Sequence, residues 1–279
     1  MTSPPEPATR TGPAIAVIVS TYECPDALDA VLQSLEDQTY RRFAVVVADD
    51  GSGPDTRTLV ARRAEEVDFP LHHVWQEDRG YRLAAVRNRA AAATELPYLI
   101  FLDGDCLVRP DYLRRHARLA ERGRFVHGSR VRLDRELSRL ALRGEFPLQR
   151  WSSARWLVER LRGRADRFTA LLRLPLGPLR RVSSRAWRGV KGCNLAVWRT
   201  DFLAVNGFDE GFEGWGFEDN DLVVRLIRNG VRRKEGRYAV PVLHLWHEER
   251  PPDPASRERF ERRLRSDGTR PEQGVDRYD

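Results

Sequence analysis

Residues 98–105 read YLIFLDGD, an apolar run that ends in Asp103 and Asp105 with Gly104 between them. A short apolar run bounded by polar residues predicts a buried strand. Two carboxylates so close together at its end repel each other unless a cation lies between them. Oxygen ligands of this kind suit Mg²⁺ or Mn²⁺, with phosphate oxygens filling the other coordination positions. Gly104 also lets the backbone approach a ligand closely.

The flanking sequence alternates strands with helices. Residues 14–20 (AIAVIVS) and 43–48 (FAVVVA) predict two more buried strands. Apolar residues at helical spacing predict helices over 25–37, 56–64, 83–93 and about 219–229, and a further strand is expected near 125–131. This alternation indicates the α/β fold class, with a mostly parallel sheet flanked by helices.

Polar residues follow each of the predicted strands. Thr21 and Tyr22 come after the first strand, and Asp49 and Asp50 come after the second. Ligands of open parallel sheets bind outside the carboxyl ends of the strands, so we expect these clusters to share one site with Asp103. For Asp49-Asp50-Gly-Ser taken alone, ordinary turn chemistry stays an equal alternative.

The composition excludes several classes of protein. Of the 279 residues, 41% are apolar and 32% are charged, which excludes a disordered acidic chain. The longest apolar runs are far shorter than the ~20 residues that cross a bilayer. Three cysteines without Cys-x-x-Cys spacing argue against a disulfide framework or structural zinc. We therefore expect a cytoplasmic protein, with peripheral attachment to the inner membrane face left open.

The charge is concentrated in one segment. The net charge is +7, but residues 135–191 hold fourteen Arg, one Lys and four acidic residues, a local balance of +11. A uniformly basic nucleic-acid binder is therefore disfavoured, and we expect no nucleic-acid partner. The predicted organisation has a disordered leader (1–13), a single domain (14–250) made of two halves (14–131 and 191–250) with an Arg/Trp-rich insert (132–190) between them, and a polar C-terminal tail (251–279).

Six motifs occur together in one order. They are VSTYECPDALDAVLQSLEDQ, VVADDGS, EDRGYRLAAVRNRA, YLIFLDGDC, GFDEGFEGWGFEDNDL and HLWHEE. The series resembles family 2 glycosyltransferases of the GT-A (Rossmann-like) fold. Its second half is similar to the C-terminal region of β-1,4-galactosyltransferases and bacterial chondroitin-type polymerases. The resemblance covers most of residues 14–249 and leaves out the Arg-rich insert. It implies that residues 14–131 form a nucleotide-binding half and residues 191–250 an acceptor-binding, catalytic half.

The resemblance implies a set of nucleotide-sugar contacts. Arginine side chains in this set would pair with phosphate. Asp103-Gly104-Asp105 matches the family's DxD motif, and its central glycine has no side chain that could contact the donor sugar. Asn194, in a segment similar to the family's sugar-pocket strand, would hydrogen-bond a hydroxyl. The implied donor-binding residues are Thr21, Tyr22, Asp49, Asp50, Arg82, Arg87, Asp103, Gly104, Asn194 and Trp215.

The same resemblance implies a metal site for Mn²⁺ or Mg²⁺. Asp105 matches the metal ligand of the DxD motif, Asp103 lies beside the donor or metal, and His247 matches the family's later histidine ligand. His244 is the rival for that role. An odd separation on a strand would point the two histidines to opposite faces, so we expect only one of them to serve.

Asp219 matches the family's catalytic base, and Glu218 its neighbour. Both begin a predicted helix, whose dipole would keep their carboxylates ionised at neutral pH; acidic residues that merely cap a helix are the alternative. Trp215 offers a flat face to a sugar ring, or else is a core residue. Phe217 occupies a position where relatives often have glycine, and its ring would narrow the donor or acceptor pocket.

The predicted function is metal-dependent, inverting transfer of a sugar from a nucleotide-diphosphate donor to a hydroxyl acceptor such as a glycan, lipid-linked saccharide or small molecule. The donor that we expect is a UDP-sugar. A nucleotidyltransferase on a similar sheet is the first alternative, although STYECPD lacks a triphosphate-binding loop. A non-catalytic glycan or nucleic-acid binding module is the second. The Arg/Trp-rich segment would bind an anionic membrane surface or an anionic acceptor, or be an ordinary solvated insert.

Overall fold

The computed structural model describes residues 12–144, 146–248 and 251–278. Residues 1–11 of the predicted leader therefore lie outside the described residues. Ten strands are assigned within the described part: β1 (Ile15–Thr21), β2 (Phe43–Asp49), β3 (Leu71–Trp75), β4 (Tyr98–Asp103), β5 (Cys106–Val108), β6 (Arg124–His127), β7 (Arg130–Arg132), β8 (Asn194–Trp198), β9 (Arg232–Glu235) and β10 (Val242–His244).

Nine α-helices are assigned in the same residues. They are α1 (Pro25–Glu36), α2 (Pro54–Glu66), α3 (Leu83–Ala92), α4 (Tyr112–Leu119), α5 (Arg135–Leu142), α6 (Ser153–Leu161), α7 (Arg199–Ala204), α8 (Glu218–Arg228) and α9 (Pro254–Arg265). Four short 3₁₀ helices are η1 (Leu148–Arg150), η2 (Thr169–Leu171), η3 (Gly177–Arg181) and η4 (Val275–Tyr278).

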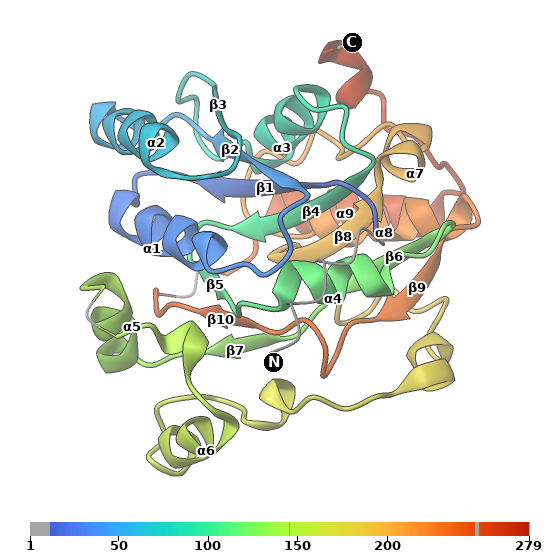
Figure 1. Cartoon of the computed structure of the whole chain (residues 1–279). Helices are drawn as coiled ribbons and strands as arrows, with labels where there is room; N and C mark the ends of the chain where they lie inside the picture. Colours follow the sequence, from blue (N-terminus) through green and yellow to red (C-terminus); the bar gives the residue numbers. More distant parts are fainter. Residues whose placement is uncertain (1–11, 145, 249–250, 279) are drawn as a thin grey trace, which may run out of the picture.

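A seven-stranded sheet forms the centre of the molecule, in the order β3-β2-β1-β4-β8-β6-β9 (Figure 1). The first four of these strands are parallel, and β8 runs antiparallel to both of its neighbours. β1 and β2 are buried along their whole length, as near-continuous apolar strands of a covered sheet should be. The predicted α/β class with a mostly parallel, helix-flanked sheet is confirmed.

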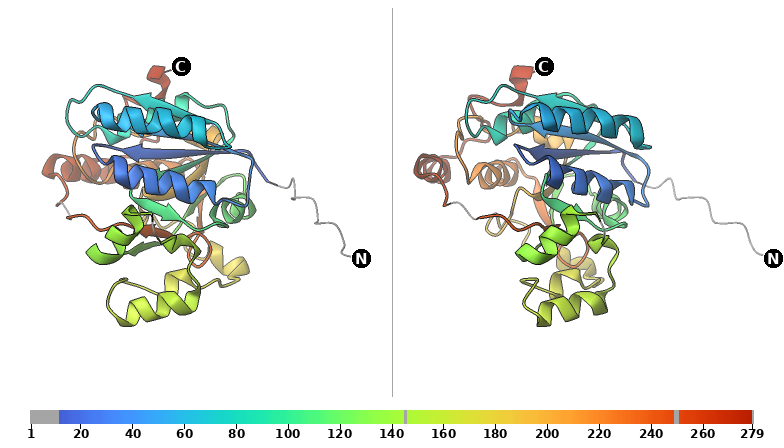
Figure 2. Two further views of the ribbon diagram at one scale, coloured as in Figure 1. Left: turned by 60° about the vertical axis from the view of Figure 1, so that its left-hand side comes forward. Right: turned by 90° about the vertical axis from the view of Figure 1, so that its left-hand side faces the viewer.

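Helices cover both faces of this sheet. Side chains alternate along β1, so Val17 and Val19 pack with α1 and α2, whereas Ala16 and Ile18 pack with α3, α7 and α8. A second sheet of three short strands, β5-β10-β7, lies beside the first and carries the chain into the insert. Both views in Figure 2 show the insert, with α6, as a layer on one side of this sheet pair.

The structure differs from two expectations about the elements. The strand predicted near residues 125–131 is two strands, β6 and β7, in different sheets. The chain bends at Gly128, where an added Cβ would lie 2.1 Å from Asn194 Nδ2. Residues 251–279 were expected to form a polar tail, but within them α9 packs on α8 and buries Phe260.

Candidate active site

The predicted clusters meet at one edge of the large sheet. Thr21 at the end of β1 is in register with Asp49 at the end of β2, and Ser20 is in register with Asp103 at the end of β4. The carboxyl ends of these three parallel strands therefore place their polar residues together, as the sequence predicts. Gly104 continues this edge, and its N–H donates to Ser20 O at 2.7 Å.

Gly104 is required by this packing rather than by an observed ligand. A Cβ at this position would lie 2.7 Å from Ser20 O, a distance that no real side chain tolerates. The close approach is thus between the turn after β4 and the backbone of β1. It fixes the direction in which Asp103 and Asp105 leave the sheet.

Arg87 on α3 joins two of the predicted acidic groups. Its side chain is 1% exposed, and it donates to Asp103 Oδ1 at 2.6 Å, to Ser20 Oγ at 3.0 Å and to Glu218 Oε1 at 3.4 Å. Burial alone would lower the pKa of this guanidinium, but the negative charges of Asp103 and Glu218 raise it. Arg87 was expected to pair with phosphate; in the structure its donors contact the Asp103 and Glu218 carboxylates and the Ser20 hydroxyl.

Glu218 and Asp219 begin α8 directly after Phe217, whose φ of 71° is left-handed. Asp219 Oδ2 accepts from Gly192 N–H at 2.6 Å and Oδ1 accepts from Asn220 N–H at 2.7 Å. Burial opposes the expected effect of the helix dipole, which would keep both carboxylates ionised. Burial raises the pKa of Asp219, and burial together with the charge of Asp219 raises the pKa of Glu218 to about 7.

Asp105, His244 and His247 form a three-residue cluster, the only group of potential metal ligands found among the described residues. Asp105 Oδ2 lies 3.6 Å from Nε2 of each histidine, and the three potential ligand atoms lie within 4.8 Å of one another. The expectation that only one histidine points here is wrong. β10 ends at His244, so strand alternation does not extend to His247.

The cluster fits a divalent cation chemically. His247 Nδ1 lies 2.8 Å from Glu248 O, which can only accept, so Nδ1 carries the proton and Nε2 is free to act as a ligand. Burial raises the pKa of Asp105 and lowers that of His244. A dication between them would compensate the buried carboxylate and would bind the neutral imidazole.

The predicted nucleotide contacts differ in how buried their side chains are and in the hydrogen bonds that these side chains already make. Thr21 Oγ1 is buried and lacks a hydrogen-bond partner among the described residues, and Tyr22 is half exposed, with its hydroxyl donating to Asp78 at 3.0 Å. Asp50 accepts from Arg82 N–H at 2.8 Å and from Gln76 Nε2 at 2.5 Å. Of Thr21, Tyr22 and Asp50, Tyr22 alone has an exposed side chain.

Two other predicted contacts, Asp49 and Arg82, have hydrogen-bond partners within the protein. Asp49 is fully buried, and bonds from His73 and Ser52 outweigh its burial and lower its pKa. The Arg82 guanidinium donates to Glu77 O, although its Nε lacks a partner within the described chain. Asp49 is thus a correction: it holds the loop after β2 and is closed to a nucleotide.

Asn194 is a second correction. It is fully buried, its Nδ2 donates to Val240 O at 2.7 Å and its Oδ1 accepts from Tyr112 Oη at 2.9 Å. No sugar hydroxyl can reach it in this packing. Trp215, in contrast, is 43% exposed, and the loop that carries it is tied to the segment before α3 by Gly214 N–H, which donates to Tyr81 O at 3.1 Å.

Tyr81 was missed from the sequence. It lies close enough to Glu218, Asp103 and Asp219 that, besides burial, their negative charges raise the pKa of its hydroxyl well above its usual range. Its place in the EDRGYRLAAVRNRA motif, one residue before Arg82, was the available signal.

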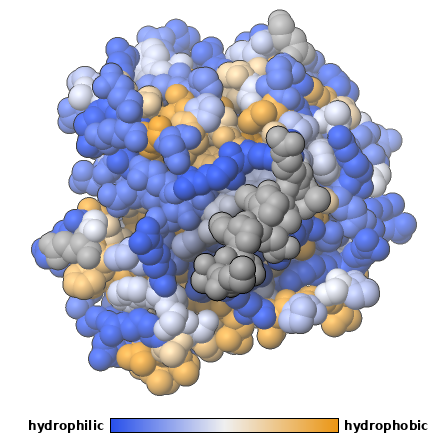
Figure 3. Space-filling model, viewed as in Figure 1, coloured by the Kyte–Doolittle hydropathy of each residue, from blue (hydrophilic) through white to orange (hydrophobic). Residues whose placement is uncertain are grey.

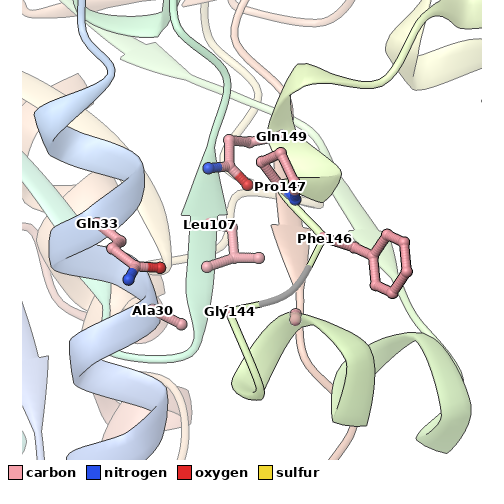
Figure 4. A pocket seen from close by; sticks show the side chains of 8 residues that line it. Ala30, Gln33, Leu107, Gly144, Phe146, Pro147 and Gln149 are labelled. Atoms are coloured by element: carbon pink, nitrogen blue, oxygen red, sulfur yellow. The ribbon is translucent and has the colours of Figure 1, made fainter.

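A small pocket lies elsewhere, between α1, β5 and the segment after α5 (Figure 4). Gln33, Leu107, Phe146 and Gln149 are among its eight lining residues, none of which carries a charge. It therefore lacks the groups that would hold a nucleotide diphosphate.

Comparisons with known proteins match the chain to two protein families. A model of glycosyl transferase family 2 matches residues 16–172, and one described as the N-terminal domain of galactosyltransferase matches residues 183–252. Validoxylamine A glucosyltransferase of Streptomyces hygroscopicus is 34% identical over 80% of this chain and 54% of its own length. Chondroitin synthase of Escherichia coli is 29% identical over 85% of this chain and 35% of its own length.

Solved structures show the same architecture. The mannosyltransferase PcManGT of Pyrobaculum calidifontis, in complex with GDP-Man and Mn²⁺, superposes with a TM-score of 0.60 at 19% identity, over 84% of this chain and 57% of that one. S. aureus TarS in complex with UDP gives 0.61 at 14% identity, over 95% and 68%. The fold is that of the GT-A glycosyltransferases.

The chain belongs to glycosyl transferase family 2, since that model matches more than half of its residues. The resemblance read from the six motifs is thereby confirmed. The chain spans about half the length of the curated glucosyltransferases it matches. Among the described residues, no helix combines the length and apolar character that crossing a bilayer requires.

Proposed function

We propose that this chain transfers a sugar from a nucleotide-diphosphate donor to an acceptor hydroxyl, with inversion at the anomeric carbon. The observation that carries the proposal is the meeting of two groups at one sheet edge. One is the metal-ligand cluster Asp105, His244 and His247. The other is the acidic pair Glu218 and Asp219, which Arg87 connects to Asp103.

The donor is proposed to be a UDP-sugar. Support comes from relatives whose names include a glucosyltransferase and a chondroitin synthase, and from a TarS structure in complex with UDP-GlcNAc. Thr21 Oγ1, buried without a partner in the described chain, and the half-exposed Tyr22 would contact the base and ribose. Trp215 would stack on a sugar ring.

Asp105, His244 and His247 would hold the divalent cation. Two imidazoles and one carboxylate suit Mn²⁺ better than Mg²⁺, which prefers oxygen ligands and retains its waters. When bound, the ion would neutralise the charge that develops on the departing diphosphate. Asp103, turned towards Arg87 by a 2.6 Å ion pair, would act on the donor side of this cluster.

Asp219 is proposed as the base. In the reaction, the acceptor oxygen bonds to the anomeric carbon, the bond from that carbon to the diphosphate oxygen breaks, and the hydroxyl proton passes to Asp219. Both Asp219 oxygens accept backbone N–H bonds, which favour the ionised form that a base needs. Glu218, held by Arg87, would position the acceptor beside it.

Replacement of Asp219 by Asn tests the proposal. We expect UDP release from UDP-glucose or UDP-N-acetylglucosamine to fall at least ~100-fold, because general-base catalysis contributes about that much. UDP binding with Mn²⁺, measured by calorimetry, should stay near wild type. Asp55→Asn, an exposed acid in the first turn of α2, is the matched control. Wild-type turnover in Asp219→Asn would remove this residue from the mechanism.

A further inference from the structure

The insert between β7 and β8 carries unusual apolar side chains on its surface. Among the described residues, eight of the thirteen exposed large hydrophobic side chains lie between Leu142 and Val182. Single exposed apolar side chains are ordinary, but a concentration in one segment marks an interaction surface. Figure 3 shows apolar patches gathered along the lower edge of the molecule, interrupted by hydrophilic residues.

Helix α6 shows the pattern most clearly. Ala154, Leu157, Val158 and Leu161 follow the spacing i, i+3, i+4, i+7 of one helical face, and all four are exposed, Leu161 to 79%. The opposite side of the helix buries Trp156 and Glu159 against the domain. The solvent-facing side of this helix is therefore an apolar stripe, whereas a surface helix of a globular protein normally has polar residues on that side.

Arginines flank this stripe. Arg155, Arg160 and Arg162 are exposed, and Arg160 has no acidic partner among the described residues. The buried Glu159 pairs with Arg155 and Arg162, which holds these two guanidinium groups beside the stripe. Because residues 135–191 carry a balance of +11, two copies of this face would repel each other, whereas a negatively charged surface would attract it.

A basic pocket adjoins the apolar surface. Arg115, Arg118, Arg173 and Arg180 line it together with Leu174, which is itself 43% exposed. Arg115 and Arg173 pair with Asp111, and the buried Arg180 donates to backbone carbonyls, whereas the exposed Arg118 has no acidic partner among the described residues. The exposed Leu179 and Val182 follow on the same segment. Guanidinium groups beside exposed apolar side chains match a phospholipid, whose phosphate lies next to its acyl chains.

We propose that the insert docks on an anionic lipid bilayer through the apolar stripe of α6 and the exposed apolar side chains of residues 173–182, with Leu157 and Leu161 at the acyl boundary and the flanking arginines among the phosphates. The docking does not depend on the proposed transferase activity.

Co-sedimentation with vesicles tests this proposal on the full chain. We expect binding to vesicles that mix phosphatidylglycerol with phosphatidylcholine, weak binding to pure phosphatidylcholine, and release by salt. The double variant Leu157→Gln/Leu161→Gln should lose at least ~10-fold in vesicle affinity. Arg160→Glu should lose at least ~5-fold, since each basic residue near an anionic surface contributes about that much.

Leu264→Gln is the matched control, because Leu264 is 40% exposed but lies on α9, outside the insert. Its vesicle affinity should equal that of wild type. Melting curves check the folding of each variant, and Leu179→Gln/Val182→Gln replaces the first pair if that pair does not fold. Absent binding of wild type to anionic vesicles, or unchanged binding of the folded double variant, would overturn the proposal. A dimer that the double variant dissociates without a change in vesicle binding would overturn it too.

Discussion

Arg87 is the residue on which the acidic groups of the candidate site depend. Its guanidinium is buried between Asp103 on β4 and Glu218 on α8, which come from different halves of the sequence. Removal of one partner of a buried ion pair leaves an uncompensated charge in a low-dielectric environment. The same contact therefore determines both the stability of the domain and the geometry of its acidic edge.

We predict that Arg87→Gln lowers the free energy of unfolding by about 3–5 kcal/mol, the cost of breaking a buried pair. Denaturant unfolding followed by tryptophan fluorescence measures it. Arg41→Gln is the control, because the Arg41–Asp68 pair is exposed (57% and 68%) and its loss should cost less than about 1 kcal/mol. If both variants lost the same small amount of unfolding free energy, Arg87 would not stabilise the fold through its buried ion pairs.

Glu218 predicts how stability depends on pH. Its pKa is raised from an ordinary 4.5 to about 7, mainly by burial. Between these values the folded chain holds a proton that the unfolded chain has released, so stability falls as pH rises. In metal-free buffer, wild type should lose about 1–3 kcal/mol relative to Glu218→Gln between pH 4.5 and 7.5. Denaturant midpoints across this range measure the difference; parallel curves for the two proteins would contradict it.

The sequence predicts the position of a site residue where a motif contains it, but not where the packing of distant segments decides whether its side chain is accessible. Asp105 and His247 were predicted from the sequence, and His244 joined them only because β10 ends at that residue. Asn194 and Asp49 carry suitable chemical groups, but their hydrogen bonds are used inside the protein. Whether a polar side chain already has its hydrogen bonds depends on partners that are distant in the chain, and a local sequence pattern does not contain them.

At the scale of elements, α9 holds the loop that begins the acidic helix. The Phe260 ring stacks on Phe217 with centroids 5.2 Å apart, and packs edge-on against Trp187 at 5.1 Å. Phe217 has the left-handed backbone conformation that is unfavourable for a residue with a side chain. The aromatic stack offsets that cost and fixes the entry to α8.

We predict that Phe260→Ala lowers the free energy of unfolding by about 3 kcal/mol, since it removes a buried aromatic ring. Donor turnover should fall as well, because Phe217 directly precedes Glu218 and Asp219. Leu264→Ala on the same helix is the control, and its 40% exposure predicts a much smaller change. Thermal and denaturant unfolding, with UDP release, give both quantities. Unchanged stability in Phe260→Ala would mean that α9 is dispensable to the domain.

The helices and strands that could be predicted are those whose pattern lies within their own sequence. The buried strands β1, β2 and β4 stand out as apolar runs, and α8 was expected within a residue of its bounds. α9 has a strongly polar sequence, PASRERFERRLR, and buries little beyond Phe260 and Ser256. Its attachment comes from ion pairs such as Arg263–Asp221 at 2.7 Å, which only the folded chain reveals.

For the whole molecule, the candidate site is built from both halves of the chain. Asp103 and Asp105 follow β4 in the first half, whereas Asp219 and His247 belong to α8 and the segment after β10 in the second. The two family models likewise match residues 16–172 and 183–252. A ligand that contacts both halves would therefore stabilise the domain as one unit.

We predict that UDP with Mn²⁺ raises the melting temperature by several degrees, since a ligand at ~100 times its dissociation constant adds about 2.7 kcal/mol. Removal of the metal with EDTA should abolish most of this shift, because the diphosphate would lose its cation. Asp105→Asn, His244→Ala and His247→Ala should each reduce the shift, measured as the difference with and without ligand so that any change in intrinsic stability cancels. His72→Ala, an exposed histidine on β3, is the control and should keep the full shift. A shift that survives EDTA, or Asp105→Asn, would contradict the assignment of the metal cluster, whereas loss in only one histidine variant would identify a single imidazole ligand.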